Sequence, residues 1–449
     1  MTDLLVYGAE ELVVGPDGTT GSTEIELERY EDGAVAVEDG EIVSVGNTSD
    51  VVEGHPRENS VRTIDARGMA VLPGFVDPHT HAVFAGDRSD EFGAKLRGKR
   101  YQEILAEGGG ILRTVRACRA ASDERLLTNL LEHLDVMLAN GTTTVEVKSG
   151  YGLDVETELR LLEAIRRADE RHPVDAVATF MGAHAVPDGQ DADEYVDEIV
   201  DEQLPAVAER GVAEFCDVFC EEGVFTVEQS RRVLEAGLDH GLAPKVHAEE
   251  FERTGGAQLA ADLDAVSADH LLRATDEDVE ALVEGGVVPV VLPGTAFGLG
   301  AEYADARAFL EAGAPVAVAT DFNPNCYARS QAFAASLACV GMRMTPAEAI
   351  VGTTRNAALA IGRGDGLGTL REGAPADLLV LDAPNHVHVP YRFDDSAVET
   401  VVKAGDVVYE RRSGRVDDDY AVEDYAVEDY AGGDSTVDDD ADFDGGDRT

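Results

Sequence analysis

Residues 71–81 read VLPGFVDPHTH, an apolar run that ends in two histidines, His79 and His81, separated by one residue. Alternate residues of a β-strand point to the same side, so this spacing places two imidazoles next to each other. Neighbouring imidazoles are suitable ligands for a divalent metal. Two surface histidines would be the simpler interpretation, but their position directly after an apolar strand favours metal ligands.

Seven more short apolar runs follow, separated by helix-forming stretches such as 124–141 and 227–241, each of which ends in Gly. Eight strand–helix repeats within residues 71–364 are typical of a (β/α)8 barrel, which is an α/β fold. We therefore expect the barrel strands to lie within residues 71–81, 142–150, 174–184, 213–223, 242–250, 265–271, 287–294 and 315–324.

Polar residues of the metal-binding type stand at the ends of these predicted strands. His184, His247, His270 and Asp321 end the third, fifth, sixth and eighth strands. Each alone could be structural, but barrel enzymes carry their active sites at the C-terminal ends of the strands. The simplest partition takes as metal ligands His79, His81, His247 and Asp321. Three neutral nitrogens and one carboxylate leave a coordination position open for water, as a catalytic site requires.

The two ends of the chain have a different pattern from the middle. Residues 1–70 and 365–415 consist of short alternating strands with Gly and Asp turns, so we expect them to form one small β-sandwich domain. Residues 416–449 contain 14 acidic residues and one Arg, with a DYAVE repeat. This low-complexity composition cannot form a core and predicts a disordered acidic tail.

The charge of the 449-residue chain excludes several classes of partner. Its formal net charge is −53, with 89 acidic and 36 basic residues, and only five of the basic residues are Lys. Such a polyanion is not expected to bind nucleic acid or an anionic membrane surface. An acidic, Lys-poor composition along the whole chain indicates a halophilic protein, since high salt screens the self-repulsion.

The remaining composition favours a cytoplasmic protein. The five cysteines, an odd and sparse set, argue against a disulfide framework and for a reducing compartment. The N-terminal residues lack the pattern of a signal peptide, and no apolar run approaches the ~18 residues of a membrane span. Cys216 and Cys220 lack zinc-motif spacing and are expected to be buried thiols.

Taken together, the strand-end residues and the two β-rich ends (LPGFVDPHTH at 72–81 and GAPADLLVLD at 373–382) resemble the amidohydrolase superfamily over about residues 4–412. Within it, the chain resembles the imidazolonepropionase family. The segments that carry this narrower resemblance are HAVFAGDRSDEF (81–92), GGGILRTVRA (108–117), VEVKSGYGL (145–153), MGAHAVP (181–187), KVHAEE (245–250) and TDFNPN (320–325).

The resemblance implies a substrate and its contacts. Members of that family open the ring of 4-imidazolone-5-propanoate with water, giving N-formimidoyl-L-glutamate, the third step of histidine degradation. Arg88 would bind the carboxylate of this small anionic substrate in a bidentate manner. Tyr151 and His184 would hold the ring and its oxygen, and Tyr101 is a weaker candidate for a contact. A surface salt bridge is the alternative interpretation of Arg88.

The expected mechanism uses one Zn²⁺ or Fe²⁺, which lowers the pKa of its bound water. Asp321, aided by His270, would take the water proton, and His184 would help to stabilise the oxyanion. Glu250, three residues after His247, or protonated Asp321 would deliver a proton to the departing ring nitrogen. The neighbouring Glu249 is expected to be solvated.

One segment departs from the family pattern. After Asp321 the family reads N-P-G-[ST], with substrate contacts from the last two residues, whereas this chain has Asn323 and Pro324 followed by Asn325 and Cys326. Asn tolerates unusual backbone angles, but a thiol is a weaker donor than a hydroxyl. We expect the change to affect substrate affinity more than reaction type, with Asn323, Asn325 and Cys326 still at the substrate.

Three alternatives remain open at this stage. A carboxylated Lys148 could bridge two metals, although related enzymes place that lysine on the fourth strand, where this chain has Glu221 and Glu222. A ring aminohydrolase of the nucleobase-deaminase type would use the same metal residues but release ammonia. A catalytically inactive scaffold would use the acidic tail to bind a partner. Barrel enzymes of this kind also commonly form homodimers.

Overall fold

The computed structural model describes residues 2–16, 25–99, 103–104 and 108–411. The predicted acidic tail, 416–449, lies outside these residues. Among the described helices, none is both long and apolar enough to cross a membrane.

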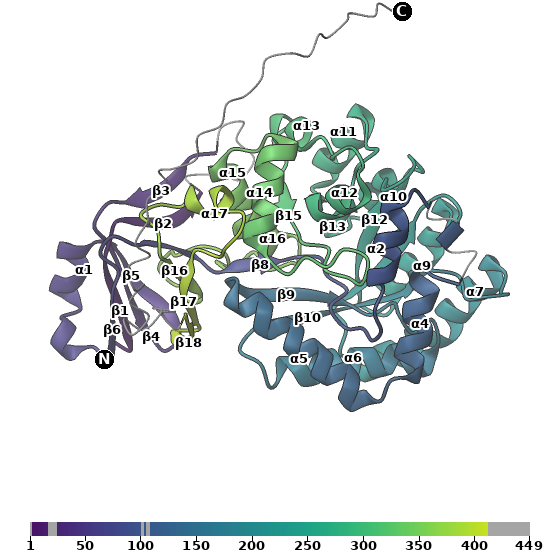
Figure 1. Ribbon diagram of the computed structural model, residues 1–449, viewed down its shortest axis with the longest axis horizontal. Coiled ribbons are helices and arrows are strands. Elements are labelled where there is room, and N and C mark those ends of the chain that lie inside the picture. Colours follow the sequence, from purple (N-terminus) through teal and green to yellow (C-terminus); the bar gives the residue numbers. More distant parts are fainter. Residues whose placement is uncertain (1, 17–24, 100–102, 105–107, 412–449) are drawn as a thin grey trace, which may run out of the picture. The chain divides into compact units, whose positions relative to one another are not determined.

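Eight parallel strands form a barrel, with the sheets of the chain ends to its left in Figure 1. The strands follow one another around the barrel in chain order, and a bridge between Thr80 and Phe322 joins the first strand to the last. All eight strands predicted from the sequence are present, so the predicted fold class is confirmed. They are β8 (Phe75–Asp77), β9 (Thr142–Lys148), β10 (Asp175–Ala183), β11 (Phe215–Cys220), β12 (Ala243–Ala248), β13 (Ser267–His270), β14 (Val288–Val291) and β15 (Ala317–Val318).

Helices connect the strands and cover the outside of the barrel (Figure 1). Local sequence explains where they begin: α9 starts at a capping box of Thr226 and Gln229, which satisfies backbone N–H groups of the first turn. The helices are α2 (Ser89–Leu96), α4 (Ile111–Ala120), α5 (Asp123–Ala139), α6 (Val155–Asp169), α7 (Ala192–Glu198), α8 (Leu204–Arg210), α9 (Val227–Asp239), α10 (Gly256–Asp262), α11 (Asp276–Gly285), α12 (Pro293–Leu299), α13 (Ala306–Glu311), α14 (Gln331–Met342), α15 (Pro346–Thr353) and α16 (Arg355–Leu359).

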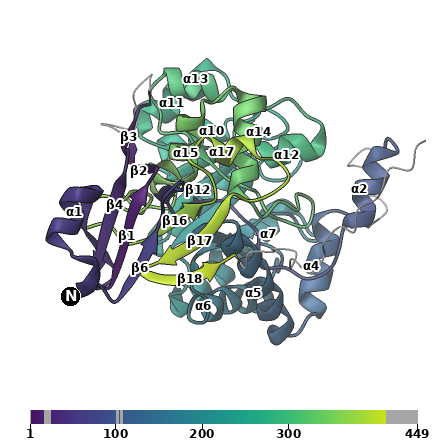
Figure 2. The same ribbon diagram turned by 60° about the vertical axis from the view of Figure 1, so that its left-hand side comes forward.

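Two further sheets combine strands from both chain ends. Figure 2 shows the C-terminal strands in yellow beside the N-terminal strands in purple. One sheet has the order β5-β4-β1-β6 and the other β18-β17-β16-β7-β2-β3. Their elements are β1 (Leu4–Ala9), β2 (Glu11–Pro16), β3 (Leu27–Tyr30), β4 (Gly33–Glu38), β5 (Glu41–Asn47), α1 (Thr48–Gly54), β6 (Arg62–Asp65), β7 (Ala70–Pro73), β16 (Leu378–Leu381), α17 (His388–Tyr391), β17 (Val398–Lys403) and β18 (Asp406–Glu410).

The junction between these sheets and the barrel lies inside the apolar run of residues 71–81. Strand β7 pairs with β16 in the end sheet, while β8, one residue later, pairs with β9 in the barrel. Gly74 separates them, and a Cβ there would lie 2.4 Å from Oγ1 of Thr143. The run therefore supplies two short strands to two sheets, and the predicted division at residues 70 and 71 falls within β7.

Candidate active site

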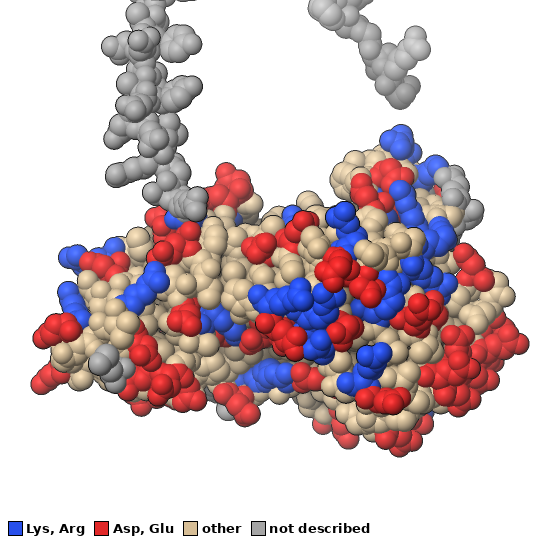
Figure 3. All heavy atoms as spheres, turned by 90° about the horizontal axis from the view of Figure 1, so that it is seen from below, with Lys and Arg blue, Asp and Glu red and all other residues tan. Residues whose placement is uncertain are grey.

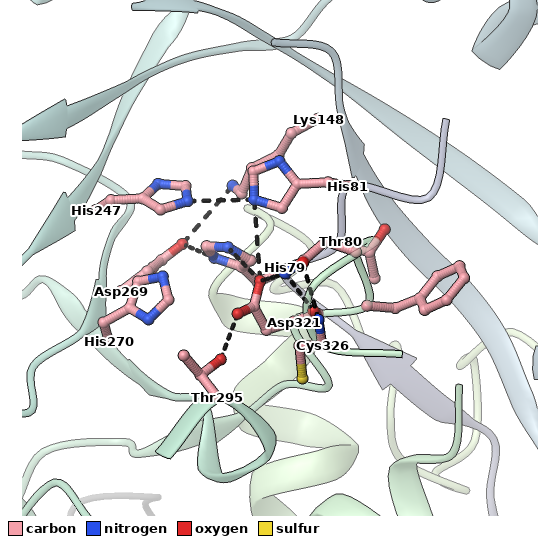
Figure 4. Close-up of polar contacts among 12 residues, drawn as sticks. His79, Thr80, His81, Lys148, His247, Asp269, His270, Thr295, Asp321 and Cys326 are labelled. Atoms are coloured by element: carbon pink, nitrogen blue, oxygen red, sulfur yellow. Dashed lines mark hydrogen bonds and ion pairs between the residues drawn. The ribbon is translucent and has the colours of Figure 1, made fainter. Parts of the chain in front are cut away.

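The polar residues predicted at the strand ends lie together at the mouth of the barrel (Figure 4). His79 and His81 follow β8, His247 lies in β12, His270 ends β13, and Asp321 follows β15. All five side chains are buried, and Figure 4 shows them pointing toward one another. Barrel closure brings residues up to 242 positions apart into one cluster, because the C-terminal ends of parallel strands share one rim.

Two overlapping groups in this cluster have the geometry to hold a metal ion. His79, His81 and Asp321 form one, and His79, His247 and His270 the other, each with ligand atoms within 4.8 Å of one another. The two groups meet where Nε2 of His81 lies 3.3 Å from Nε2 of His247. Oδ1 of Asp321 lies 3.7 Å from Nε2 of His79 and 3.9 Å from Nε2 of His81.

Two buried carboxylates orient the histidines from behind. Nδ1 of His79 donates to Asp269 over 2.6 Å, and Nδ1 of His247 lies 3.2 Å from Oδ1 of Asp217. A carboxylate partner keeps the proton on Nδ1 and leaves the Nε2 lone pair directed at the site, as in metal centres. The sequence analysis missed both carboxylates; the signal was an Asp inside each predicted barrel strand, at FCDVFC and SADH.

The chemistry of the side chains in this cluster is suitable for binding a divalent metal. Nε2 of His79, Nδ1 of His81 and Nδ1 of His270 are buried without a hydrogen-bond partner among the described residues. Burial, together with nearby positive charge, holds the pKa of each of these histidines well below its usual value, so they are neutral. Neutral imidazoles with unused nitrogens beside a carboxylate form a buried metal-binding group.

Lys148 does not favour a second metal. Its Nζ is fully buried and lies 2.7 Å from both Glu146 and Asp217. Burial lowers its pKa, but these carboxylates outweigh burial and raise the pKa above its usual value, so the amine is charged. A bridging carboxylated lysine requires a neutral amine. Glu221, directly after the fourth strand, instead accepts hydrogen bonds from backbone N–H groups of residues 251 and 252.

Asp321 is held in an unusual backbone conformation, with a φ of 52°. The Thr295 hydroxyl donates to its Oδ2, and Nδ2 of Asn323 donates to its Oδ1 over 2.9 Å. Burial raises the pKa of Asp321 to about 6. Left-handed backbone at a non-Gly residue is costly and commonly marks a functional position.

Glu250 lies next to His270, with 3.8 Å between Oε2 and Nε2. Burial, reinforced by the charges of Asp321 and Glu221, raises the pKa of Glu250 well above its usual value. Its neighbour Glu249 is buried as well and accepts hydrogen bonds from backbone N–H groups before and within α10. The expectation that Glu249 is solvated was therefore wrong, because it caps that helix.

A cavity of about 810 Å³ opens beside the histidine cluster. Most of the predicted substrate-contact residues line it, although they come from different loops. Tyr101 lies outside the described residues, and Cys326 is not among the lining residues. Those that line the cavity are Arg88, Tyr151, His184, Glu250, Asn323 and Asn325, together with His81, His247, His270 and Asp321.

Arg88 is buried and already paired. Its Nε and Nη2 lie 3.0 and 2.9 Å from Oε2 of Glu91, three residues later at the start of α2. Oε1 of Glu91 in turn accepts from the backbone N–H of Gly110. The alternative of a surface salt bridge was therefore wrong about the location: Arg88 forms a salt bridge, but a buried one, and it lines the cavity.

His184 has a defined tautomer. Its Nδ1 lies 2.9 Å from the carbonyl oxygen of Gly150, which can only accept, so Nδ1 carries the proton. Burial lowers the pKa of His184 to about 3. The ring stacks on His81 with 4.8 Å between centroids and lies 5.2 Å from the ring of Tyr151. His184 therefore presents an unprotonated Nε2 to the cavity side of the site.

Hydrogen bonds between side chains and the backbone hold the loop after Asp321. Oδ1 of Asn323 accepts from the backbone N–H groups of Asn325 and Cys326, at 2.7 and 3.0 Å. The Cys326 thiol is buried and donates to the carbonyl oxygen of Thr320 over 3.6 Å. The side chain of Asn325 accepts a 2.6 Å hydrogen bond from Nζ of Lys95, a residue that the sequence analysis did not single out.

Comparisons with known proteins show the family of this chain. The Amidohydrolase family model matches residues 70–408. The imidazolonepropionase of Haloarcula marismortui is 66% identical over 406 residues, covering 90% of this chain and 96% of that protein. The one from Halobacterium salinarum is 64% identical over 411 residues, covering 90% and 97%.

Both relatives come from haloarchaea, in line with the acidic composition. Among solved structures, a zinc-bound adenosine deaminase from Xanthomonas campestris has a TM-score of 0.69 at 20% identity, covering 92% of this chain and 94% of that one, and shares the fold. The family match and the two close relatives establish that this chain belongs to the amidohydrolase family and, within it, to the imidazolonepropionases.

Proposed function

We propose that this protein hydrolyses 4-imidazolone-5-propanoate to N-formimidoyl-L-glutamate, the third step of histidine degradation. The observation that carries the proposal is the pairing of a buried His/Asp metal-binding group with a cavity that also contains a buried arginine, Arg88. The imidazolonepropionases that it resembles carry this activity in their name. The substrate is a small ring with an anionic arm. The ring suits the metal-binding group, and the carboxylate of the arm suits the guanidinium of Arg88.

The metal ligands in this proposal are His79, His81, His247 and Asp321, and the metal is Zn²⁺ or Fe²⁺. When bound, such an ion lowers the pKa of a water molecule and polarises the ring carbonyl. His270 belongs to a geometric group with His79 and His247, but its side chain also lies beside Glu250. We assign His270 to proton handling, since the four-ligand set already combines three nitrogens with a carboxylate.

Arg88 holds the substrate carboxylate, and His184 and Tyr151 hold the ring. Because His184 carries its proton on Nδ1, its Nε2 accepts a hydrogen bond. This tautomer favours an interaction with a ring N–H over the oxyanion stabilisation expected from the sequence. The stacked ring of His81 keeps the plane of His184 in place.

Two carboxyl groups move the protons. Asp321, whose second oxygen is held by Thr295, takes a proton from the attacking water as the water oxygen bonds to the ring carbonyl carbon. Glu250 is buried, and burial raises its pKa well above the usual value, which favours the protonated form that can donate. It delivers its proton to the ring nitrogen as the bond between that nitrogen and the carbonyl carbon breaks.

The test is to supply 4-imidazolone-5-propanoate to metal-loaded protein in molar KCl and to follow the ultraviolet absorbance of the ring and the release of ammonia. We expect ring loss without ammonia, and its abolition by a chelator. Ammonia release would instead identify a ring aminohydrolase. Absence of turnover by folded, metal-replete protein would reject the proposed activity.

A further inference from the structure

Next to the cavity, a lysine contacts the lining residue Asn325, and the proposed mechanism leaves its role unexplained. Lys95 lies on α2, is half-buried, and its Nζ donates to Oδ1 of Asn325 over 2.6 Å. Among the described residues its partner is this neutral amide, and none is a carboxylate within ion-pair distance. A half-buried lysine held by an amide is notable in a chain with 89 acidic residues.

The contact between Lys95 and Asn325 fixes which way the amide points. An ammonium group has only donors, so it must face the oxygen of the side-chain amide. The opposite atom, Nδ2, then carries two N–H donors. Asn325 lines the cavity together with Arg88, so those donors are available to an anion inside it.

The local charge also needs Lys95. Arg88 is paired with Glu91, and the two charges cancel to a first approximation. A carboxylate that approaches this pair meets little net attraction unless another cation is near. Lys95 provides it: burial and then the positive charge of Arg88 lower the pKa of Lys95, which places both cations in one electrostatic environment. A bound carboxylate would relieve that repulsion.

We propose that Lys95 is a positioning residue: it orients the side-chain amide of Asn325, which the family resemblance already implies is at the substrate, toward the substrate carboxylate, and it supplies the net positive charge beside Arg88. This inference rests on the proposed function, since it concerns the residues that bind the carboxylate arm of the same substrate. Asn325 stands where the family pattern has Gly, and its backbone N–H donates to Oδ1 of Asn323 over 2.7 Å, which leaves the side-chain amide to reach the substrate.

A general electrostatic field is the competing explanation. Residues 88–119 contain eight basic and four acidic residues, and Arg97, Lys99, Arg113 and Arg116 line a groove beside α2 and α4. Figure 3 shows Lys and Arg side chains gathered on part of this face, next to surface where Asp and Glu predominate. Such a field would attract any anion without help from Asn325. The proposal predicts that substrate affinity depends on Lys95 in particular, whereas a general field predicts a similar dependence on any nearby lysine or arginine.

The test compares Lys95→Met with Arg97→Met, an equal loss of charge at an exposed position two residues away on the same segment. We expect Lys95→Met to raise KM for 4-imidazolone-5-propanoate about 10- to 100-fold with kcat little changed, the effect of one charge-assisted hydrogen bond. Lys95→Arg should restore most of the affinity, and Arg97→Met should change KM less than about twofold. An equal effect of both methionine variants would overturn the inference in favour of the field.

Binding of two inert ligands separates this inference from the proposed activity. Calorimetry with imidazole-4-propanoate and with 4-methylimidazole compares a ring that carries the carboxylate with one that lacks it. We expect Lys95→Met and Asn325→Ala to weaken only the first, and the double variant to lose less affinity than the sum of the two single losses, because Lys95 acts in part through Asn325. Equal weakening of both ligands, or additive single effects, would contradict the inference. Failed turnover by the wild type would count against the activity alone.

Discussion

At the scale of single residues, the site depends on groups that hold other groups in place. Asp217 contacts both His247 and Lys148, and Asp269 contacts His79, so each carboxylate fixes a tautomer of a histidine without reaching the cavity. Lys148, fully buried, compensates the charges of Glu146 and Asp217. A buried network of this kind is stable only when every member keeps its partner.

Replacing Asp217 tests this arrangement. We expect Asp217→Asn to lower metal affinity about 10- to 100-fold, since a neutral amide accepts from His247 more weakly than the carboxylate and can also turn its NH₂ donors toward the ring. Glu146→Gln is the matched control, because Glu146 also pairs with Lys148 but contacts no histidine of the cluster. A competition titration with a chromophoric chelator measures both. Equal loss of affinity in the control would show that only the neutralisation of Lys148 matters.

The assignment of the proton donor makes a second prediction at this scale. Glu250→Gln keeps the size of the side chain but removes the proton, so kcat should fall about 10²- to 10⁴-fold while bound metal is unchanged. Asp321→Asn should lower both kcat and metal content, because Asp321 is assigned to the metal as well as to the proton. Metal analysis alongside steady-state kinetics distinguishes the two. Loss of metal from Glu250→Gln would mean that Glu250 supports the metal group.

At the scale of elements, the two chain ends are joined by a few buried polar contacts as well as by strand pairing. Glu11 on β2 accepts from the backbone N–H of His386 over 2.7 Å and pairs with the His386 ring and Arg29, each at 2.8 Å. Burial would raise the pKa of Glu11, but the hydrogen bonds from His386 and Arg29 outweigh it and lower the pKa to about 2. Glu11 thus stabilises the fold as the carboxylate.

This contact predicts a pH dependence. A carboxyl whose pKa is lower in the folded state contributes stability above its unfolded pKa, near 4.5, and loses it as the pH falls toward about 2. We expect Glu11→Gln to destabilise the protein by about 1–3 kcal/mol at pH 7. Denaturant unfolding in molar KCl should give the same difference at higher pH and a smaller one below pH about 4.5. A difference that does not change with acidification would rule out the carboxylate as its source.

At the scale of the whole molecule, repulsion among acidic residues opposes the compact state. The predicted tail contributes 14 of the 89 acidic residues, and residues 1–415 still carry a formal charge of −40. Salt shortens the screening length from ~10 Å at 0.1 M to ~3 Å at 1 M, so it weakens repulsion between neighbouring surface carboxylates. The stability of the folded part should therefore depend on salt even when the tail is removed.

We expect the unfolding midpoint of the full chain to rise between about 0.1 and 2 M KCl, and that of residues 1–415 to rise by a similar amount. Scanning calorimetry of both proteins checks this, with sucrose as a control that stabilises without screening. If deletion of the tail removed the salt dependence, the repulsion would arise from the tail and not from the folded surface.

The sequence by itself determined the barrel, the β-rich contribution of both chain ends and the identity of the strand-end histidines. Strand patterns can be recognised in short segments, and barrel enzymes carry their active sites at the C-terminal ends of the strands. It did not reveal that residues 70–77 serve two sheets, since Gly74 is required only by its approach to Thr143. Nor did it predict Asp217 behind His247 or Lys95 on Asn325, residues 30 and 230 positions apart. Such pairs come into contact only when the barrel closes, so the tertiary structure alone decided them.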